Sequence, residues 1–118
     1  MRKIHNYYKG HLAEIFAAIS LSLKGYQILR RRYKTPVGEI DLIAKRGKII
    51  VAVEVKARPT IQMGIEAIST HQRLRICKAM RQYKRNSRWK SHCTRYDAVV
   101  VRPFSWPSHI IDVWRETY

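Results

Sequence analysis

The first long apolar pattern along the chain has the spacing of an α-helix. Apolar side chains recur every three or four residues between positions 8 and 24, which predicts one helix with an apolar stripe facing the core. The stripe consists of Leu12, Ile15, Phe16, Ile19 and Leu23. Gly25 follows, and glycine is common just past the end of a helix because it tolerates the left-handed conformation.

The central part of the chain contains the short apolar runs that are typical of β-strands. We predict strands over residues 26–33, 39–46 and 49–57, with a turn between the first two. Only Gly47 and Lys48 separate the second strand from the third. Glycine in the first central position of a two-residue loop indicates a type II′ β-hairpin.

The remaining third of the chain predicts a second helix and two more strands. The helix spans residues 70–86 with Thr70 as a plausible N-cap, and the strands span 96–101 and 110–114. The buried stripe of this helix consists of Ile76, Cys77, Met80 and Tyr83. The order α-β-β-β-α-β-β predicts a mixed central β-sheet flanked by helices, an α/β or α+β fold. We expect one domain over residues 1–118.

The predicted hairpin gathers acidic residues on one face of the sheet. The other face is an apolar core surface of Ile40, Leu42, Ala44, Val51, Val53 and Val55. With a two-residue loop, Asp41 lies opposite Glu54, and Glu39 lies opposite Lys56. Two carboxylates about 5 Å apart repel by roughly 3 kcal/mol at an effective dielectric constant near 20. A hard divalent cation such as Mg²⁺ or Mn²⁺ relieves this repulsion, since it prefers oxygen ligands. The pattern therefore predicts a metal site.

Lys56 adds a third chemical group to this face. Its ammonium can hold or polarise an attacking water, or neutralise developing phosphoryl charge, as metal-assisted phosphodiester hydrolysis requires. The alternative is a surface hairpin in which Glu39 and Glu54 form ordinary ion pairs with Lys56. This alternative does not explain why Asp41 lies opposite Glu54. Both interpretations depend on the loop, because a three-residue loop would turn one acid into the core.

Charge indicates a class of partner. The 118 residues include 24 Lys and Arg against 8 Asp and Glu, a formal net charge of +16. Such an excess predicts polyanions as partners, DNA or RNA ahead of an anionic membrane, with a ribosomal or merely adhesive basic protein as the alternative. No stretch approaches the roughly 20 apolar residues of a membrane span, and no signal-peptide cleavage site follows the first apolar stretch. We expect a cytoplasmic protein.

Two groups of basic residues are candidate contacts to nucleic-acid phosphates, although any one of them taken singly is more often a solvated surface charge. They are Arg30, Arg31 and Arg32 in the first strand, and Arg75, Lys78 and Arg85 on the second helix. No base-reading motif is present, so we expect recognition of backbone and shape.

The stretches that carry the acids resemble a known family. The chain closely resembles the YraN family of uncharacterised bacterial proteins in GEIDLIA at 38–44 and VEVKAR at 53–58. Asp41 followed by Glu54-Val55-Lys56 is similar to the signature of the PD-(D/E)XK nucleases. Further similarity lies at Gly10, Glu14, Gly25-Tyr26, Gly64 and Arg95-Tyr96-Asp97.

The resemblance implies a restriction-endonuclease-like core similar to that of archaeal Holliday-junction resolvases, a Mg²⁺ or Mn²⁺ cofactor and a DNA substrate. It implies that Asp41, Glu54 and Lys56 are catalytic. It also implies that Glu14, from the first helix, reaches the metal with Asp41 and Glu54, directly or through water, while an ordinary exposed glutamate is the alternative. By the same analogy, a symmetric junction would suit a homodimer.

The chain departs from the family pattern at three positions. Arg32 stands where asparagine is common, Gln72 where a lysine is expected, and Ala52 where phenylalanine is usual. The acids are intact, so metal binding is still expected, and the departures bear on substrate contacts and rate.

Two functions stay open. The first is a divalent-metal-dependent endonuclease acting on structured or branched DNA. The second is a nucleic-acid-binding protein with a nuclease fold and little or no turnover. Both predict salt-sensitive DNA binding, so metal-dependent cutting is the property that separates them.

Overall fold

The computed structural model describes the backbone of residues 2–116 and the side chains of residues 10–116. Three helices and five strands follow one another along this part of the chain. They are α1 (Arg2–Leu23), β1 (Gln27–Thr35), β2 (Gly38–Arg46), β3 (Ile49–Ala57), α2 (Ile61–Glu66), α3 (Thr70–Arg85), β4 (Cys93–Val101) and β5 (Ser108–Trp114). The predicted order is confirmed, with α2 added inside a segment that we expected to be a loop.

Hydroxyl side chains cap the N-termini of α2 and α3. Thr60 caps α2 by accepting a hydrogen bond from the Met63 N–H, and Ser69 caps α3 by accepting one from the Gln72 N–H. The predicted N-cap of α3, Thr70, is therefore wrong by one residue, since Ser69 has the extended backbone that an N-cap needs.

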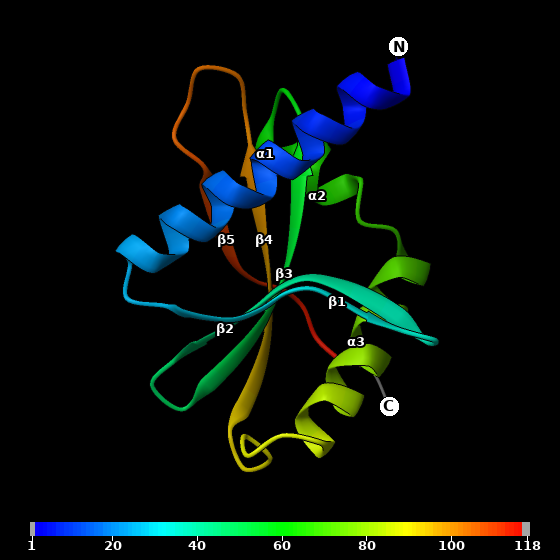
Figure 1. Ribbon diagram of the computed structural model, residues 1–118, viewed down its shortest axis with the longest axis vertical. Helices are drawn as coiled ribbons and strands as arrows, with labels where there is room; N and C mark the ends of the chain where they lie inside the picture. Colours follow the sequence, from blue (N-terminus) through cyan, green and yellow to red (C-terminus); the bar gives the residue numbers. More distant parts are fainter. Residues whose placement is uncertain (1, 117–118) are drawn as a thin grey trace.

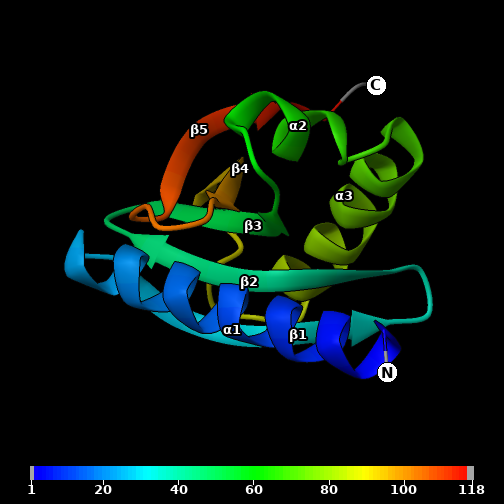
Figure 2. The same cartoon turned by 90° about the horizontal axis from the view of Figure 1, so that it is seen from above.

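The five strands form one mixed sheet in the order β1-β2-β3-β4-β5. Only the β3–β4 pair is parallel, and the crossover between these strands carries α2 and α3. In the described part of the chain, α1 lies by itself on one face of the sheet, while α2 and α3 lie on the other, as Figure 1 and Figure 2 show. The expectation of a mixed sheet flanked by helices is confirmed. No helix among the described residues is long and apolar enough to cross a membrane.

Both faces of the sheet are buried. The α1 face is formed by Leu42, Ala44, Val51 and Val53, and the α3 face by Ile43, Ile50 and Ala52. The first four were predicted to share a core face, and this is confirmed. Ile40, which alternation placed with them, packs instead in the cluster beneath α3, beside Tyr33. Strict alternation fails there because the first residues of β2 stay paired with β1 but turn away from β3.

Helix α1 buries a different face from the one that its pattern predicts. Its buried side chains are Ala13, Ala17, Ser20 and Leu21, and the predicted core residues Leu12, Phe16, Ile19 and Leu23 are exposed. Small side chains allow the helix to lie close against the sheet, which leaves the larger apolar stripe on the outside. The prediction that this stripe faces the core is wrong.

The register of the β2–β3 hairpin agrees with the prediction. Arg46 pairs with Ile49 across the two-residue loop, and the pairing continues in step to Leu42 and Val53. Gly47 has a φ of 59°, as the first central residue of a type II′ turn requires.

Beyond Leu42 and Val53 the two strands separate. β2 remains paired with β1 as far as Gly38, whereas β3 remains paired with β4 as far as Ala57. Figure 1 shows β1 and β2 turning away from β3 and β4. We call this opening, bounded by Asp41 and Glu54, the fork. The predicted opposition of Glu39 and Lys56 does not form, because β2 and β3 have already separated at these positions, and Glu39 pairs with Lys34 of β1 alone.

Candidate active site

Asp41 and Glu54 are the first residues of β2 and β3 past the last paired positions, so they form the base of the fork. The Oδ2 atom of Asp41 accepts a hydrogen bond of 2.9 Å from the Val55 N–H. The side chain thus replaces part of the strand pairing that ends here, and it holds its carboxylate within hydrogen-bonding reach of Glu54.

Glu54 is buried on the α3 side of the sheet, with only 3% of its surface exposed. Lys56 approaches it, with Nζ 3.8 Å from Oε2. Gln72, in the first turn of α3, donates a hydrogen bond from Nε2 to the same oxygen. The sequence marked Gln72 only as a departure from a family pattern. Its contact with Glu54 depends on how α3 packs, which no local pattern specifies.

The environment of Glu54 favours its protonated form. Burial raises its pKa most, the hydrogen bond and charge of Asp41 raise it further, and Lys56 lowers it, so that the pKa rises from 4.5 to about 10. Near neutral pH the two carboxyl groups therefore hold a proton between them. A cation that takes the place of this proton would relieve the same repulsion.

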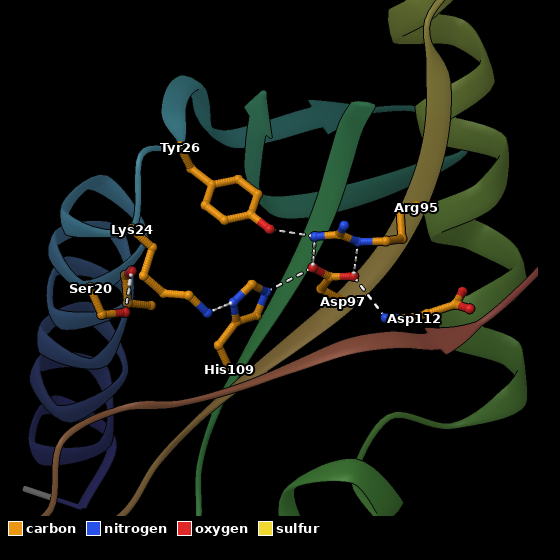
Figure 3. A network of polar contacts seen from close by, with 8 residues as sticks. Ser20, Lys24, Tyr26, Arg95, Asp97, His109 and Asp112 are labelled. Atoms are coloured by element: carbon orange, nitrogen blue, oxygen red, sulfur yellow. Dashed lines mark hydrogen bonds and ion pairs between the residues drawn. The ribbon is translucent and has the colours of Figure 1, made fainter. Parts of the chain in front are cut away.

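A second buried acid, Asp97 of β4, is surrounded by hydrogen-bond donors instead of by another carboxylate (Figure 3). Its carboxylate is 0% exposed and accepts two hydrogen bonds from Arg95, at 2.9 and 2.8 Å, and one of 2.9 Å from the Asp112 N–H. Lys24 contacts Nδ1 of His109 at 2.6 Å, and a lysine only donates. The Nε2–H of His109 is therefore free to donate to Asp97, at 2.7 Å.

These hydrogen-bond partners decide the direction in which the pKa of Asp97 is shifted. Burial raises its pKa, but the hydrogen bonds from His109, Arg95 and the Asp112 backbone outweigh burial and hold the pKa below its usual value. Asp97 is thus a compensated structural acid that joins β5 to β4. The Asp41–Glu54 pair lacks such compensation, because its one ion pair among the described residues is the 3.8 Å contact with Lys56.

Glu14 lies on α1 and pairs with Arg32. Its Oε2 accepts a hydrogen bond of 2.7 Å from Nε of Arg32, and the guanidinium also contacts His11. In the described part of the chain, no three His, Cys, Asp or Glu side chains gather closely enough to hold a metal ion. The role of Glu14 as a third ligand therefore stays a prediction.

Arg32 has a φ of 52°, in the left-handed region. Asparagine adopts this conformation more readily than other side-chain-bearing residues. This gives a physical reason for the asparagine that is common at this place in the resembling family. Ala52, another departure, is fully buried opposite Ile43.

The predicted phosphate-contacting residues differ in their surroundings. Five are exposed, and Arg32 alone of the six is partly buried against Glu14. The exposed ones are Arg30, Arg31, Arg75, Lys78 and Arg85. Arg75 lies close to the fork, since its backbone carbonyl packs directly against Gly38 at the start of β2. Helix α3 thus brings basic side chains and Gln72 to the same side of the sheet as Glu54.

The donor set at the fork fits Mg²⁺ or Mn²⁺. Mg²⁺ is commonly held by one or two carboxylates together with water and substrate phosphate oxygens, and it needs no cage made of protein alone. Asp41 and Glu54 would supply the two carboxylates. The raised pKa of Glu54 is what a buried acid with a second carboxylate as its neighbour is expected to have.

Comparison with known proteins assigns a family. Residues 13–101 match the family described as "Uncharacterised protein family UPF0102". A UPF0102 protein of Chelativorans sp. (strain BNC1) is 47% identical over 109 residues, which cover 92% of this chain and 88% of the relative. A UPF0102 protein of Sinorhizobium medicae (strain WSM419) is 45% identical over 107 residues, covering 90% of this chain and 88% of the relative. These names state a family and no activity. They confirm the family resemblance seen in the sequence: the chain belongs to the UPF0102 (YraN) family.

Proposed function

We propose that the fork is the active centre of a divalent-metal-dependent endonuclease that acts on structured or branched DNA. The observation that carries this proposal is the close carboxylate pair of partly buried Asp41 and buried Glu54, which has a single ion pair, with Lys56, among the described residues. In a chain with 24 basic and 8 acidic residues, a base for each acid was readily available. Two adjacent acids that share one ion pair, the 3.8 Å contact of Lys56 with Glu54, are best explained by a cation that binds between them.

Each side chain at the fork has a chemical role in this proposal. A divalent cation bound by Asp41 and Glu54 would supply Lewis acidity toward a phosphodiester. Lys56, which is partly buried beside Glu54, orients the attacking water or neutralises the charge that develops on the phosphoryl oxygens. Gln72 keeps the Glu54 carboxylate oriented through its hydrogen bond.

The substrate class follows from charge and shape. The net charge of +16 favours a polyanion, and the exposed basic residues of α3 stand on the same side of the sheet as Glu54. We found no base-reading motif, so the proposed enzyme recognises the backbone and shape of DNA. The preference for branched DNA rests on the resemblance to junction resolvases.

A DNA-binding protein with this fold and little or no turnover is the second candidate. The contact between Gln72 and Glu54 favours it, since a neutral amide occupies one carboxylate oxygen and brings no positive charge to the fork. In this candidate function, the protein binds DNA through the same surface but does not carry out metal-assisted hydrolysis.

The test is nicking of junction, duplex and single-stranded DNA in Mg²⁺, Mn²⁺ or EDTA. We expect cutting only with metal, and a loss of about 100-fold or more in Glu54→Gln and Asp41→Asn, with DNA affinity retained. Asp112→Asn is the matched control, because Asp112 lies on the edge strand β5 and pairs with exposed Arg115. Asparagine also tolerates the φ of 59° at this position.

Two results would decide against the enzyme. Cutting that persists in Glu54→Gln would trace the activity to a contaminant. If the protein binds DNA without metal but cuts none of the three substrates, the second candidate, a DNA-binding protein with little or no turnover, is supported instead.

A further inference from the structure

Between residues 12 and 23, the outer face of α1 is an exposed apolar surface. Leu12, Phe16 and Ile19 are about half exposed, and Leu23 is 72% exposed. These four positions, which we call the α1 seam, follow one another at intervals of four, three and four residues. This is the spacing of the contact positions in a pair of packed helices.

The α1 seam is free of basic charge although the chain is strongly cationic. No lysine or arginine occurs between residues 10 and 23. An acidic partner would be expected to meet basic residues, and a helix that lies on an anionic membrane usually carries lysine or arginine beside its apolar stripe. The side chains that flank the seam are instead Ile15, Ala18 and Ser22. The seam is therefore suited to an uncharged, apolar partner surface.

We propose that the α1 seam joins two copies of this chain, with the two α1 helices antiparallel across a two-fold axis. The seam is self-complementary, because its spacing reads the same in both directions. An antiparallel partner places its Leu23 against Leu12, and its Ile19 against Phe16. A contact of this kind uses one patch on both copies and closes as a dimer. It also brings two cationic chains together along a helix stretch that has no lysine or arginine between residues 10 and 23, away from the basic residues of α3.

A hollow beside the seam extends the contact. It has a volume of about 390 Å³ and is lined mostly by apolar side chains, among them Leu12, Phe16 and Phe104, with Arg58 and Arg102 also in its lining. Phe104, in the β4–β5 loop, is fully exposed at its edge. In the antiparallel arrangement the partner's Leu23 lies against Leu12, at the mouth of this hollow. The most exposed leucine of one copy thus meets the open apolar hollow of the other.

The first test is the mass of the chain in solution, by light scattering at protein concentrations on the order of 100 μM. We expect twice the 14.0 kDa of one chain for the wild type, and 14.0 kDa for Ile19→Glu. Leu74→Glu is the matched control, since Leu74 is 48% exposed on α3 and Ile19 is 47% exposed on α1. Circular dichroism checks that each variant is folded. A wild type that stays at 14.0 kDa, or a Leu74→Glu variant that dissociates equally, would overturn the proposal.

The second test measures the register by disulfide cross-linking in a Cys93→Ser background, since Cys93 is the exposed native cysteine. Phe16→Cys/Ile19→Cys should form a covalent dimer on oxidation, because the two positions face each other between antiparallel copies. Leu12→Cys/Phe16→Cys should not, because its cysteines face Leu23 and Ile19 of the partner. Cross-linking of the second variant would indicate parallel helices and overturn the arrangement. So would flotation of a monomeric protein with anionic vesicles. Neither test depends on nuclease activity.

Discussion

At the scale of single residues, the two buried acids on neighbouring central strands have opposite environments. Val53 of β3 pairs with Asp97 of β4, and Glu54 is the next residue along β3. Asp97 points to the α1 side, where a guanidinium, an imidazole and a backbone N–H satisfy it. Glu54 points to the α3 side, where another carboxylate is its close neighbour. One acid stabilises the fold, and the other is kept at a cost to stability.

The cost at Glu54 should be measurable without metal. Its pKa is raised in the folded chain, so stability is unaffected below pH 4.5 and falls as pH rises toward 10, because unfolding then releases a proton. Each pKa unit corresponds to about 1.4 kcal/mol. We expect Glu54→Gln to have a higher Tm than the wild type in EDTA, with a difference that grows between pH 5 and pH 8, by thermal melts.

The control for this prediction is Glu66→Gln, which makes the same chemical change on the exposed surface of α2. A Glu54→Gln variant that melts below the wild type at pH 8 would contradict the account of the fork as an uncompensated pair.

Asp97 should behave in the reverse direction. Its pKa is lowered by folding, so its contribution is present above the usual value of 3.8 and is lost as pH falls through the lowered pKa. Asp97→Asn removes the fully buried carboxylate that pairs with the partly buried Arg95 and with His109, which costs about 3 kcal/mol. We expect this loss in urea melts at pH 7, and a smaller gap from the wild type below pH 3.8. A gap of the same size at both pH values would contradict the assignment.

At the scale of elements, α3 packs closely against the start of β2, beside the fork. Gly38 begins β2, and a Cβ atom there would collide with the backbone carbonyl of Arg75. Because Gln72 lies one turn earlier on the same helix, this close approach also sets its distance from Glu54. The glycine therefore acts on the site through the position of the helix.

This close approach predicts the effect of adding one methyl group. Gly38→Ala should destabilise the chain by about 1–3 kcal/mol, because backbone atoms must move to admit it. Gly10→Ala is the control, since no heavy atom lies within 4 Å of a Cβ at that position, and alanine favours a helix. Chemical denaturation of both variants measures the difference. Equal stability of the two would show that α3 is not held this closely.

At the scale of the whole molecule, the basic residues of α3 and the α1 seam lie on opposite sides of the sheet. The basic residues of α3 lie on the side of the sheet that carries Glu54, and the uncharged seam of α1 lies on the other. A dimer through α1 would leave both α3 surfaces open. DNA and a second copy would then bind without competing for the same face.

This division predicts how affinity for DNA varies with salt. Removing one phosphate contact should reduce the slope of log K against log salt by about 1. We expect this for Arg75→Gln, whose side chain is exposed on α3 near the fork. Lys48→Gln is the control, because Lys48 lies in the hairpin loop at the other end of β2 and β3. Fluorescence anisotropy titrations between about 50 and 200 mM salt measure both slopes, and equal slopes would remove α3 from the DNA surface.

Local patterns in the sequence were enough to predict the elements and the hairpin. The β3 boundaries, the two-residue loop and the register from Arg46 and Ile49 to Leu42 and Val53 follow from alternation and from the glycine at the turn. Because side chains alternate at every residue of a strand, this register already placed Asp41 and Glu54 on one face.

Tertiary packing decided what those residues meet. The separation of β2 from β3, the contact of Gln72 with Glu54 and the pairing of Glu14 with Arg32 all join segments distant in the sequence. The clearest case is the choice of which face α1 buries. Periodicity shows that a helix has an apolar stripe, but only the fit of small side chains against the sheet decides which stripe is buried. The sequence by itself thus determined the acids at the hairpin, and the packing of α1 and α3 decided their surroundings and left an apolar face outside.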